Sequence, residues 1–345
     1  MMRNLNDMTK VVSKLQEVVG EEKVLTSLED RIAYSYDGTF EQDLPDAVVL
    51  AESTEDVVAT VRIAAEHGVP LIARGMASGL AAASVPFGGG IVLSLTRMNR
   101  ILEIDRENRV TRVEAGVVTA DLEAAVAEQG LFYPPDPSSN KQSTIGGNIA
   151  CNAGGPRCLK YGVTGDYVMG LTVVLPDGEV LQTGGRAIKN VVGYDLTSLF
   201  VGSEGTLGII TEALLRLTTE PEYVRTARAE FPALEDASRT VNAILDAGVV
   251  PATLELMDET AITCIEEAME LGLPLDVEAM LIIETDGSDG EAVQREIETV
   301  ADVCRENGAR EVVVAATEAQ REQLWRARRS VSPSLARRAP NKLGE

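Results

Sequence analysis

Residues 134–155 read PPDPSSNKQSTIGGNIACNAGG, and this stretch is the least ordinary part of the 345-residue sequence. Its three prolines fix φ, and two of them push the preceding residue toward extended conformations, so the stretch begins stiff and non-helical. The glycine pairs at 146–147 and 154–155 allow positive φ and let another group approach exposed main-chain N–H donors. Asn148 and Asn152 stand four residues apart, and a helical turn would place both amides on one side. The composition fits a cradle for an anionic or heteroaromatic ligand, and it fits a tight surface loop equally well.

Two further stretches of the same kind favour the cradle. Residues 74–80 read RGMASGL and follow an apolar run at residues 69–73 that is typical of a buried strand. Residues 202–211 read GSEGTLGIIT. The loop after the strand has the spacing GxxxG, and no GxGxxG stands at a strand-to-helix junction, so a Rossmann site is not indicated. A P-loop signature is absent as well, which argues against NAD and ATP as ligands.

Taken together, these pieces resemble the FAD-binding domain of the vanillyl-alcohol-oxidase (PCMH-type) superfamily. Within it they are most similar to the branch of glycolate oxidase flavoprotein subunits and FAD-dependent D-lactate and D-2-hydroxyacid dehydrogenases. Between residues 45 and 221 the match runs, in order, through RGxxSGL, PDPSS, IGGNxAxNAGG, CLKYG, LPDGEVL, GYDLT and FVGSEGTLGIITE. Each piece alone is weak, whereas all of them in this order are specific. The resemblance implies an α+β fold, in which a two-subdomain PCMH-type FAD-binding domain is followed by an incomplete ferredoxin-like α+β cap domain.

The resemblance also implies noncovalent FAD as cofactor and a set of residues around it. The loop at residues 74–80 would wrap the pyrophosphate with its main-chain amides, and residues 205–210 would lie near the adenosine end, although Ile210 also fits a plain core position. The implied cofactor-binding residues are Arg74, Gly75, Met76, Ala77, Ser78, Gly79, Leu80, Pro137, Ser138, Ser143, Thr144, Gly146, Gly147, Asn148, Ala150, Asn152, Gly154, Gly155, Glu204, Gly205, Gly208 and Ile210.

The first loop departs from the family pattern at three alanines. Relatives carry glycine where this chain has Ala77, Ala82 and Ala83. Alanine leaves the N–H donor free but resists positive φ. The sequence therefore predicts either a cradle of altered geometry or a reduced affinity for flavin.

Composition excludes some classes of function. A net charge of −23 and an aromatic content of 4% are unsuited to binding nucleic acid, which needs basic surface and stacking platforms. An acidic, lysine-poor surface suits a high-salt cytoplasm, and a GC-rich genome accounts for it equally well. None of the four cysteines forms a CxxC pair, so neither an iron–sulfur cluster nor a structural zinc site is indicated, and no metal ligands are assigned. No apolar run is long enough to span a bilayer.

Periodicity predicts three parts: a helical lead-in at residues 1–44, the FAD-binding domain at 45–221 and a partial C-terminal substrate or cap domain at 222–345. The lead-in is given little functional weight. Thr119 is expected to cap a helix over residues 120–129, and residues 168–175 and 179–183 to form a hairpin. Beyond residue 221 strands and helices alternate, and residues 317–336 are expected to form one helix.

The last part of the chain carries the candidate substrate residues. By resemblance, Arg328 would clamp a substrate carboxylate, with Ser332 and Lys342 near equivalent positions; the alternative for Arg328 is a solvated basic helix face. Relatives continue beyond this point into an HxGDGNxH motif that supplies metal ligands and the catalytic base, so the chain is expected to be truncated. The only histidine, His67, ends a predicted helix, where its charge suits the dipole, and lies away from the position of covalent flavin attachment.

The function that follows is FAD-dependent oxidation of a D-2-hydroxy acid, of the glycolate or D-lactate type, by hydride transfer from C2 to flavin N5. Electrons would pass to an iron–sulfur subunit or a soluble acceptor. The predicted location is the cytoplasm, with membrane contact only through a partner. Two alternatives remain: a non-catalytic flavin-binding partner subunit, and another oxidase of the superfamily acting on alditols or aldehydes.

Overall fold

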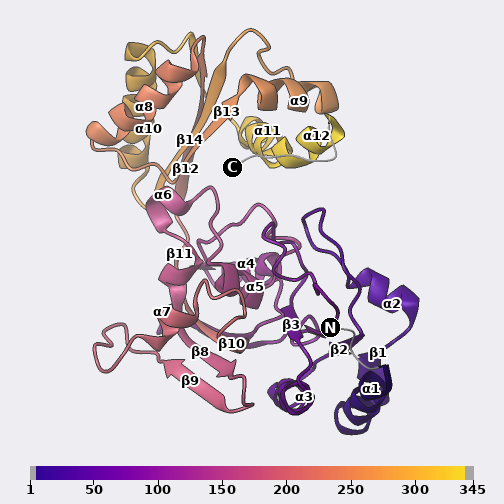
Figure 1. Ribbon diagram of the computed structural model, residues 1–345. Helices are drawn as coiled ribbons and strands as arrows, with labels where there is room; N and C mark the ends of the chain where they lie inside the picture. The colour runs from indigo at the N-terminus through magenta and orange to yellow at the C-terminus, as the bar shows by residue number, and fades with distance from the viewer. Residues whose placement is uncertain (1–4, 339–345) are drawn as a thin grey trace. The chain divides into compact units, whose positions relative to one another are not determined.

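The computed structural model describes residues 5–338, with side chains from Met8 onward. Within this range the chain divides into two compact units. The first unit contains the residues up to 154 together with 163–220, and the second contains 155–162 together with the residues from 221 onward. Figure 1 shows the elements of each.

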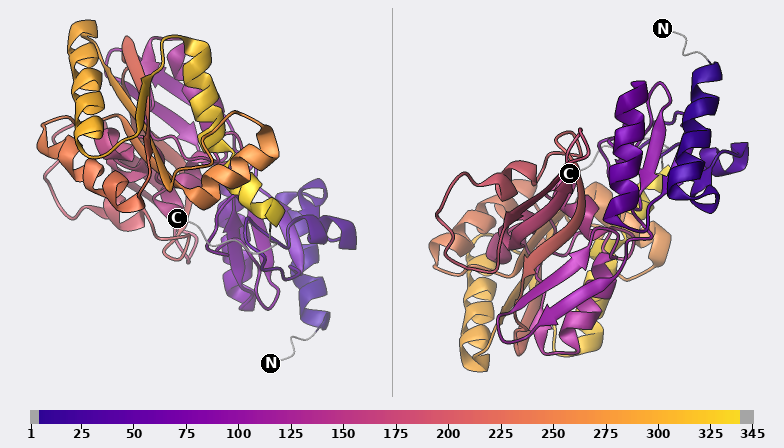
Figure 2. Two further views of the ribbon diagram at one scale, coloured as in Figure 1. Left: turned by 90° about the horizontal axis from the view of Figure 1, so that it is seen from above. Right: turned by 90° about the horizontal axis from the view of Figure 1, so that it is seen from below.

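A small, mostly parallel sheet opens the first unit. Its strands β1 (Val24–Leu25), β2 (Ala47–Leu50), β4 (Ile91–Ser94) and β3 (Leu71–Arg74) lie in that order, and β2 and β3 both run parallel to β4. Helices α1 (Leu5–Val19) and α3 (Thr54–His67) pack side by side against it, as Figures 1 and 2 show, and bury a shared apolar core. The short η1 (Glu21–Lys23) and α2 (Leu28–Ala33) complete this part.

The ends of α3 follow from its sequence. Ser53 accepts a hydrogen bond from the N–H of Asp56 at the N-terminus, and Gly68 ends the helix in the left-handed conformation at φ 61°. A short connection then leads from α3 to β3, whose last residue is Arg74.

A five-stranded antiparallel sheet forms the rest of the first unit. Its order is β5 (Ile101–Asp105), β6 (Val110–Glu114), β10 (Ile209–Arg216), β8 (Val168–Val174) and β9 (Val180–Gly184). The expected hairpin is confirmed as β8 and β9. The remaining elements of this part are α4 (Thr119–Ala127), β7 (Leu131–Phe132), α5 (Ile145–Cys151), η2 (Thr164–Tyr167), α7 (Leu196–Phe200) and β11 (Thr218–Thr219).

One helix start was predicted wrongly. Thr119 is the first residue of α4, and the N-cap is Val118, which makes no side-chain cap. The Thr119 hydroxyl instead lies 2.9 Å from Ser143 Oγ and accepts a bond from Asn148 Nδ2 at 2.7 Å. Long-range contacts with the stretch at 134–155 therefore replace the local cap.

The second unit has ferredoxin-like topology, as the resemblance implied. Strands β12 (Tyr223–Phe231), β13 (Thr253–Asp258), β14 (Ala279–Gly287) and β15 (Glu311–Val314) form an antiparallel sheet of order β13-β14-β12-β15. Helices α8 (Leu234–Asp246) and α10 (Gly290–Glu306) cover its apolar face. Helix α9 (Glu259–Met269) and the C-terminal helices lie on the opposite face, as the left view of Figure 2 shows, and α6 (Cys158–Tyr161) also belongs to this unit.

The expected single helix at 317–336 is two helices, α11 (Glu318–Arg329) and α12 (Val331–Arg338). Pro333 has no N–H, and its ring would clash with the carbonyl four residues earlier if the helix continued. The first helix therefore ends at Arg329, with Ser330 as its C-cap, and the proline falls in the first turn of the next helix, where it is tolerated.

Candidate functional site

The three glycine-containing stretches come together in the first unit. The N–H groups of Gly202 and Glu204 donate to the carbonyls of Ile149 and Ala150, at 2.9 and 2.8 Å, which joins the third stretch to α5. Gly75 meets the other end of α5, because a Cβ at this position would lie 2.3 Å from Thr144 Oγ1. Only glycine permits so close an approach to the N-cap residue of α5.

A hollow lies where the stretches meet. Its lining includes Ala83 and Ser84 from the turn after the first stretch, Leu95 directly after β4, and twelve residues from the three stretches and the adjoining strand: Ala73, Arg74, Gly75, Gly146, Gly147, Ala150, Cys151, Glu204, Gly205, Gly208, Ile209 and Ile210. Most of these residues are glycine or have small side chains. They let another group approach the main chain closely.

The loop at residues 75–84, here called the cradle, carries a continuous row of free donors. In the described chain none of its ten main-chain N–H groups donates a hydrogen bond. Two of its carbonyls do accept bonds, since Gly79 and Ala82 accept from the N–H groups of Gly38 and Val85. Unpaired main-chain donors are costly unless a ligand or water satisfies them, and successive N–H groups of this kind bind anions.

The predicted strain in the cradle is present at two of the three alanines. Ala77 and Ala82 have φ values of 53° and 57°, whereas Ala83 is not in the left-handed region. Glu204, in the third stretch, also has a positive φ of 52°. A side chain with a Cβ is disfavoured there by about 1–2 kcal/mol. The cradle thus keeps a glycine-like shape although the residues are alanines.

The polar side chains of the central stretch are turned to structural contacts. Asn148 is buried and bonds Thr119, and Asn152 accepts a bond from the N–H of Gly165, so the two amides do not face one ligand together. Thr144 Oγ1 accepts a hydrogen bond from the N–H of Gly147 and caps α5.

The two ends of the central stretch lie in different surroundings. The Pro137 carbonyl accepts a hydrogen bond from the N–H of Asn140, while Ser138 is exposed. Gly154 ends a segment of the first unit, and Gly155 belongs to the second, where its N–H donates to Cys158 Sγ.

Two single residues of the first unit carry reactive groups. Cys151 contributes to the hollow, and burial, with a smaller effect of Glu204, raises the pKa of its thiol. The ring of His67 bonds the carbonyl of Ile63 through Nδ1 at 2.9 Å and ends α3. His67 does not line the hollow, which agrees with its reading as a helix-terminal residue.

Two protein-family profiles match this chain. A profile described as an FAD binding domain matches residues 45–184, and one described as the C-terminal domain of FAD linked oxidases matches residues 220–344. The glycolate oxidase subunit GlcD of Bacillus subtilis is 46% identical over 336 residues, which cover 97% of this chain and 71% of that protein. This chain belongs to the FAD-linked oxidase family.

Further relatives of this FAD-linked oxidase agree with the assignment. The GlcD subunit of Escherichia coli K12 is 37% identical over 97% of this chain and 67% of that protein, and the D-lactate dehydrogenase of Anaerostipes hadrus is 37% identical over 92% and 68%. Among solved structures, p-cresol methylhydroxylase and a 4-ethylphenol oxidase from Gulosibacter chungangensis both align with a TM-score of 0.80, at 19% and 22% identity. The alignments cover 93% and 98% of this chain, and 69% and 73% of those chains. They share its fold. The chain spans about two thirds of the length of these relatives.

The cofactor of this FAD-linked oxidase is FAD, and the hollow fits that group. The diphosphate of FAD carries two negative charges and needs donors, and the cradle beside the hollow offers ten N–H groups without an acceptor among the described residues. Gly75, whose Cβ would collide with Thr144, keeps the cradle against α5. No helix in the described residues is long and apolar enough to cross a membrane. Residues 8–338 also hold no group of three or more His, Cys, Asp or Glu arranged for a metal ion.

The candidate substrate residues lie on the second unit. Arg328 donates from Nε to Glu255 Oε2 at 2.6 Å, and within the described residues neither of its Nη groups has a protein partner. Ser332 is exposed, and Lys342 lies outside the described residues. The resemblance implied Arg328 as a substrate residue, which stays a prediction, and the sequence did not predict its pairing with Glu255.

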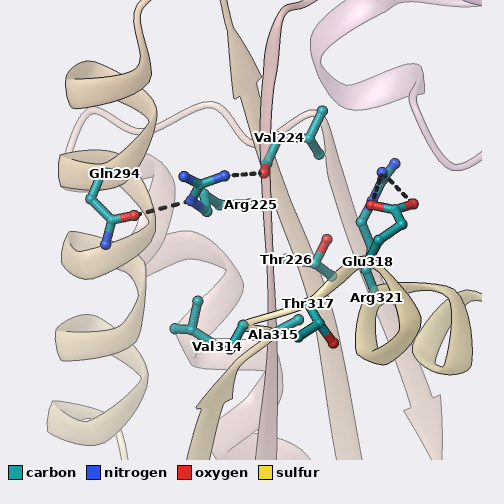
Figure 3. Close-up of a pocket in the computed structure, with 10 residues that line it drawn as sticks. Val224, Arg225, Thr226, Gln294, Val314, Ala315, Thr317, Glu318 and Arg321 are labelled. Carbon is teal, nitrogen blue, oxygen red and sulfur yellow. Dashed lines mark hydrogen bonds and ion pairs between the residues drawn. The ribbon is translucent and has the colours of Figure 1, made fainter.

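A pocket on the same unit contains two more arginines (Figure 3). Arg225 donates to Gln294 Oε1 at 3.1 Å and to the Val224 carbonyl, and Arg321 bonds both Glu318 and the buried Glu284. Each guanidinium is thus held by the protein. These residues were missed from sequence. One sequence signal could have indicated this polar region: an apolar strand ends in Glu284-Thr285-Asp286. Its two acids are two residues apart, so they lie on the same face of the strand.

Proposed function

We propose that this FAD-linked oxidase binds FAD noncovalently in the cradle of the first unit and oxidises a small 2-hydroxy acid to the 2-oxo acid. The observation that carries the cofactor part is the row of ten main-chain N–H groups at residues 75–84 without protein acceptors. The substrate class is supported by relatives named glycolate oxidase subunit and D-lactate dehydrogenase. When bound, the flavin supplies the hydride acceptor for the carbon that bears the hydroxyl.

The protein's own residues have separate tasks in this proposal. Gly75, Gly146, Gly147, Gly205 and Gly208 give the cofactor close access to the main chain, and the N–H row binds the diphosphate. Small side chains such as Ala150 leave room in the hollow. Residues 1–44, 45–221 and 222–345 are proposed as lead-in, cofactor domain and partial substrate domain.

Arg328 is proposed to bind the substrate carboxylate. Its Nε is fixed by Glu255, which leaves the paired Nη groups as a planar fork of donors suited to a carboxylate. Glu255 orients the guanidinium but also offsets part of its charge. Replacing Glu255 with glutamine would therefore keep the orientation and strengthen the field toward an anion. Ser332 and Lys342 are proposed as neighbours at the same subsite.

The proposed partners are an iron–sulfur electron-transfer subunit or a soluble electron acceptor, with the cytoplasm as the site of action. Relatives named as subunits of glycolate oxidase support the first of these.

A second candidate function is flavin binding without turnover, as a partner subunit of an oxidase. The observation that favours it is that His67 is the only histidine, and its ring is bonded at the end of α3 rather than facing the hollow. A neutral histidine is the usual base for removing a hydroxyl proton near neutral pH.

One experiment tests the cofactor and separates the two functions. The purified chain is mixed with FAD, desalted, and examined by visible absorption; a retained flavin band is expected. Anaerobic glycolate or D-lactate is then added. Bleaching of the band supports oxidation by this chain, and R328K should weaken the bleaching more than R326K, which changes a neighbouring arginine. A stable band supports flavin binding without turnover, and loss of all flavin from a folded chain overturns both.

A further inference from the structure

A short excursion between α2 and β2 folds back on itself beside the cradle. Residues 34–44, here called the 34–44 hairpin, close through an isolated bridge between Tyr36 and Gln42. The N–H of Asp43 donates to the Ser35 carbonyl at 3.0 Å, and Asp37 accepts two bonds from Thr39. From sequence, this lead-in was assigned little functional weight, but its hydrogen bonds show an ordered structure.

Arg74 connects the hairpin to the start of the cradle. It is the last residue of β3 and only 7% exposed, and its Nη1 donates to the Tyr36 carbonyl at 2.5 Å and to the Tyr34 carbonyl at 3.4 Å. Its guanidinium also stacks over the Tyr34 ring, 5.3 Å from the centroid. Burial lowers the pKa of Arg74, while the nearby Tyr34 and Asp37 favour its charge. A buried cation held by two carbonyls is a structural clamp.

A second contact joins the hairpin to the middle of the cradle. The N–H of Gly38 donates to the Gly79 carbonyl at 3.1 Å. A Cβ on Gly38 would lie 2.7 Å from that oxygen and 3.1 Å from the Ser78 carbonyl, so the two backbones touch. Asp43 extends the contact by accepting a bond from the N–H of Gly88. The hairpin therefore binds the carbonyl side of the cradle and leaves its N–H groups free.

We propose that the 34–44 hairpin is the outer wall of the FAD site and that Arg74 is a positioning residue that locks it against the cradle. This inference rests on the proposed binding of FAD in the cradle. The cradle has no regular secondary structure, so fixing it before the ligand arrives reduces the ordering entropy lost on binding. Arg74 was expected from sequence to bind the cofactor; in this proposal it acts on the cradle, through the hairpin.

The test compares R74Q, R74K and G38A with the unchanged chain, by titration of FAD followed through flavin fluorescence. We expect R74Q and G38A each to raise the dissociation constant about tenfold. The double variant should be little worse than either, because both changes release the same hairpin from the cradle. R74K should resemble R74Q, since lysine cannot bond two carbonyls and stack in the same way. The control is R97Q, which breaks the surface pair with Glu52 in the same unit and should leave binding unchanged.

A direct contact of Arg74 with phosphate gives a different pattern. R74K would then restore most of the affinity, and the effects of R74Q and G38A would multiply; either result overturns the clamp. Unchanged binding in both R74Q and G38A would also overturn it.

Amide hydrogen exchange of the cofactor-free chain supplies a readout that does not depend on FAD. Residues 35–43 should exchange faster in R74Q and G38A than in the unchanged chain or R97Q, and equal rates would overturn the clamp. If the unchanged chain fails to bind FAD, both the proposed function and the role of the hairpin as a wall of the FAD site are overturned. Faster exchange in the variants would in that case still show that Arg74 holds the hairpin in place.

Discussion

Lys160 Nζ lies 2.5 Å from Asp286 Oδ1 and 2.6 Å from the main-chain carbonyl of the same residue. Tyr161 donates its hydroxyl to Asp286 Oδ2 at 2.7 Å. Both partners belong to the sequence CLKYG, which lies inside the region matched by the FAD binding domain profile, whereas Asp286 is the next-to-last residue of strand β14. The segment 155–162 is therefore part of the second unit, although the chain before and after it belongs to the first.

Replacing Asp286 with asparagine should destabilise the second unit. The acid side chain is 5% exposed and Lys160 is 30% exposed, so the change leaves a partly buried ammonium without its carboxylate. Because Lys160 retains some solvent, we expect a loss of about 1–3 kcal/mol in the free energy of unfolding, less than for a fully buried pair. Urea unfolding followed by the fluorescence of Trp325, the only tryptophan, reports on this unit. D302N, at an exposed pair, is the control and should change little; an equal effect in both would contradict the prediction.

Glu284 should be more sensitive than Glu318, although both pair with Arg321. Oε2 of the buried Glu284 accepts bonds from Thr226 Oγ1, Arg321 Nε and Trp325 Nε1, at 2.7, 3.1 and 2.9 Å, whereas Glu318 is largely exposed. Although burial opposes the charge of Arg321, the two acids raise its pKa.

E284Q should cost about 2–4 kcal/mol in the free energy of unfolding, because it uncouples a half-buried guanidinium. It should also shift the Trp325 emission, whereas E318Q should do neither. Thermal unfolding and an emission spectrum of each variant check this, and matching spectra for the two variants would count against it.

Ala77→Gly and Ala82→Gly should stabilise the first unit. Both residues have positive φ, where alanine is disfavoured by about 1–2 kcal/mol, while glycine adds about 0.4–1 kcal/mol of chain entropy to the unfolded state. The balance predicts a gain of about 0.5–1 kcal/mol for each.

Ala83 is the matched control because it lies in the same cradle but outside the positive-φ region. A83G should lose about 0.5–1 kcal/mol, since only the entropy term applies. Calorimetric unfolding of the three cofactor-free variants measures the signs. A stabilising A83G, or a destabilising A77G, would show that the cradle adopts other backbone angles.

Burial raises the pKa of the Cys304 thiol to about 12, which predicts a loss of stability at alkaline pH. A thiol with a raised folded pKa contributes stability that is fully present below its unfolded pKa, near 8.5, and is lost as the pH rises toward 12. Unfolding of the second unit by urea should therefore become easier between pH 9 and 11, by more than in C304A, in which this titration is missing. Parallel pH profiles for the two proteins would refute the assignment.

Alkylation rates extend the cysteine prediction to the cofactor site. Cys151 lines the hollow and has a raised pKa, so iodoacetamide should react slowly at pH 7.5 and faster at pH 9.5. FAD should protect Cys151 from the reagent, whereas the buried Cys264 and Cys304 should react only after unfolding, with or without FAD. Mass spectrometry of the alkylated peptides identifies each site, and equal labelling of Cys151 with and without FAD would argue against a cofactor in this hollow.

The sequence determined the elements and the character of the site, because those depend on local chemistry. Apolar runs predicted the strand before the cradle and the hairpin at 168–183, and alternation beyond residue 221 predicted the strands and helices of the second unit. Ser53 and Gly68 are the sequence signals for the ends of α3. Three glycine-containing stretches indicated main-chain donors, and the alanines at 77 and 82 indicated the strain that their φ values show. Pro333 also carried the signal for the break between α11 and α12, which periodicity alone concealed.

Tertiary structure decided which groups meet, because contacts between residues far apart in the chain leave no periodic signal. Asn148 and Asn152, four residues apart, turn to Thr119 and Gly165 instead of to a shared ligand. Arg74 reaches back 38 residues to the Tyr36 carbonyl, and Lys160 reaches forward 126 residues to Asp286. A cation or an amide in a sequence can bond any acceptor that folding brings near, and burial then selects the pairs that satisfy each polar group.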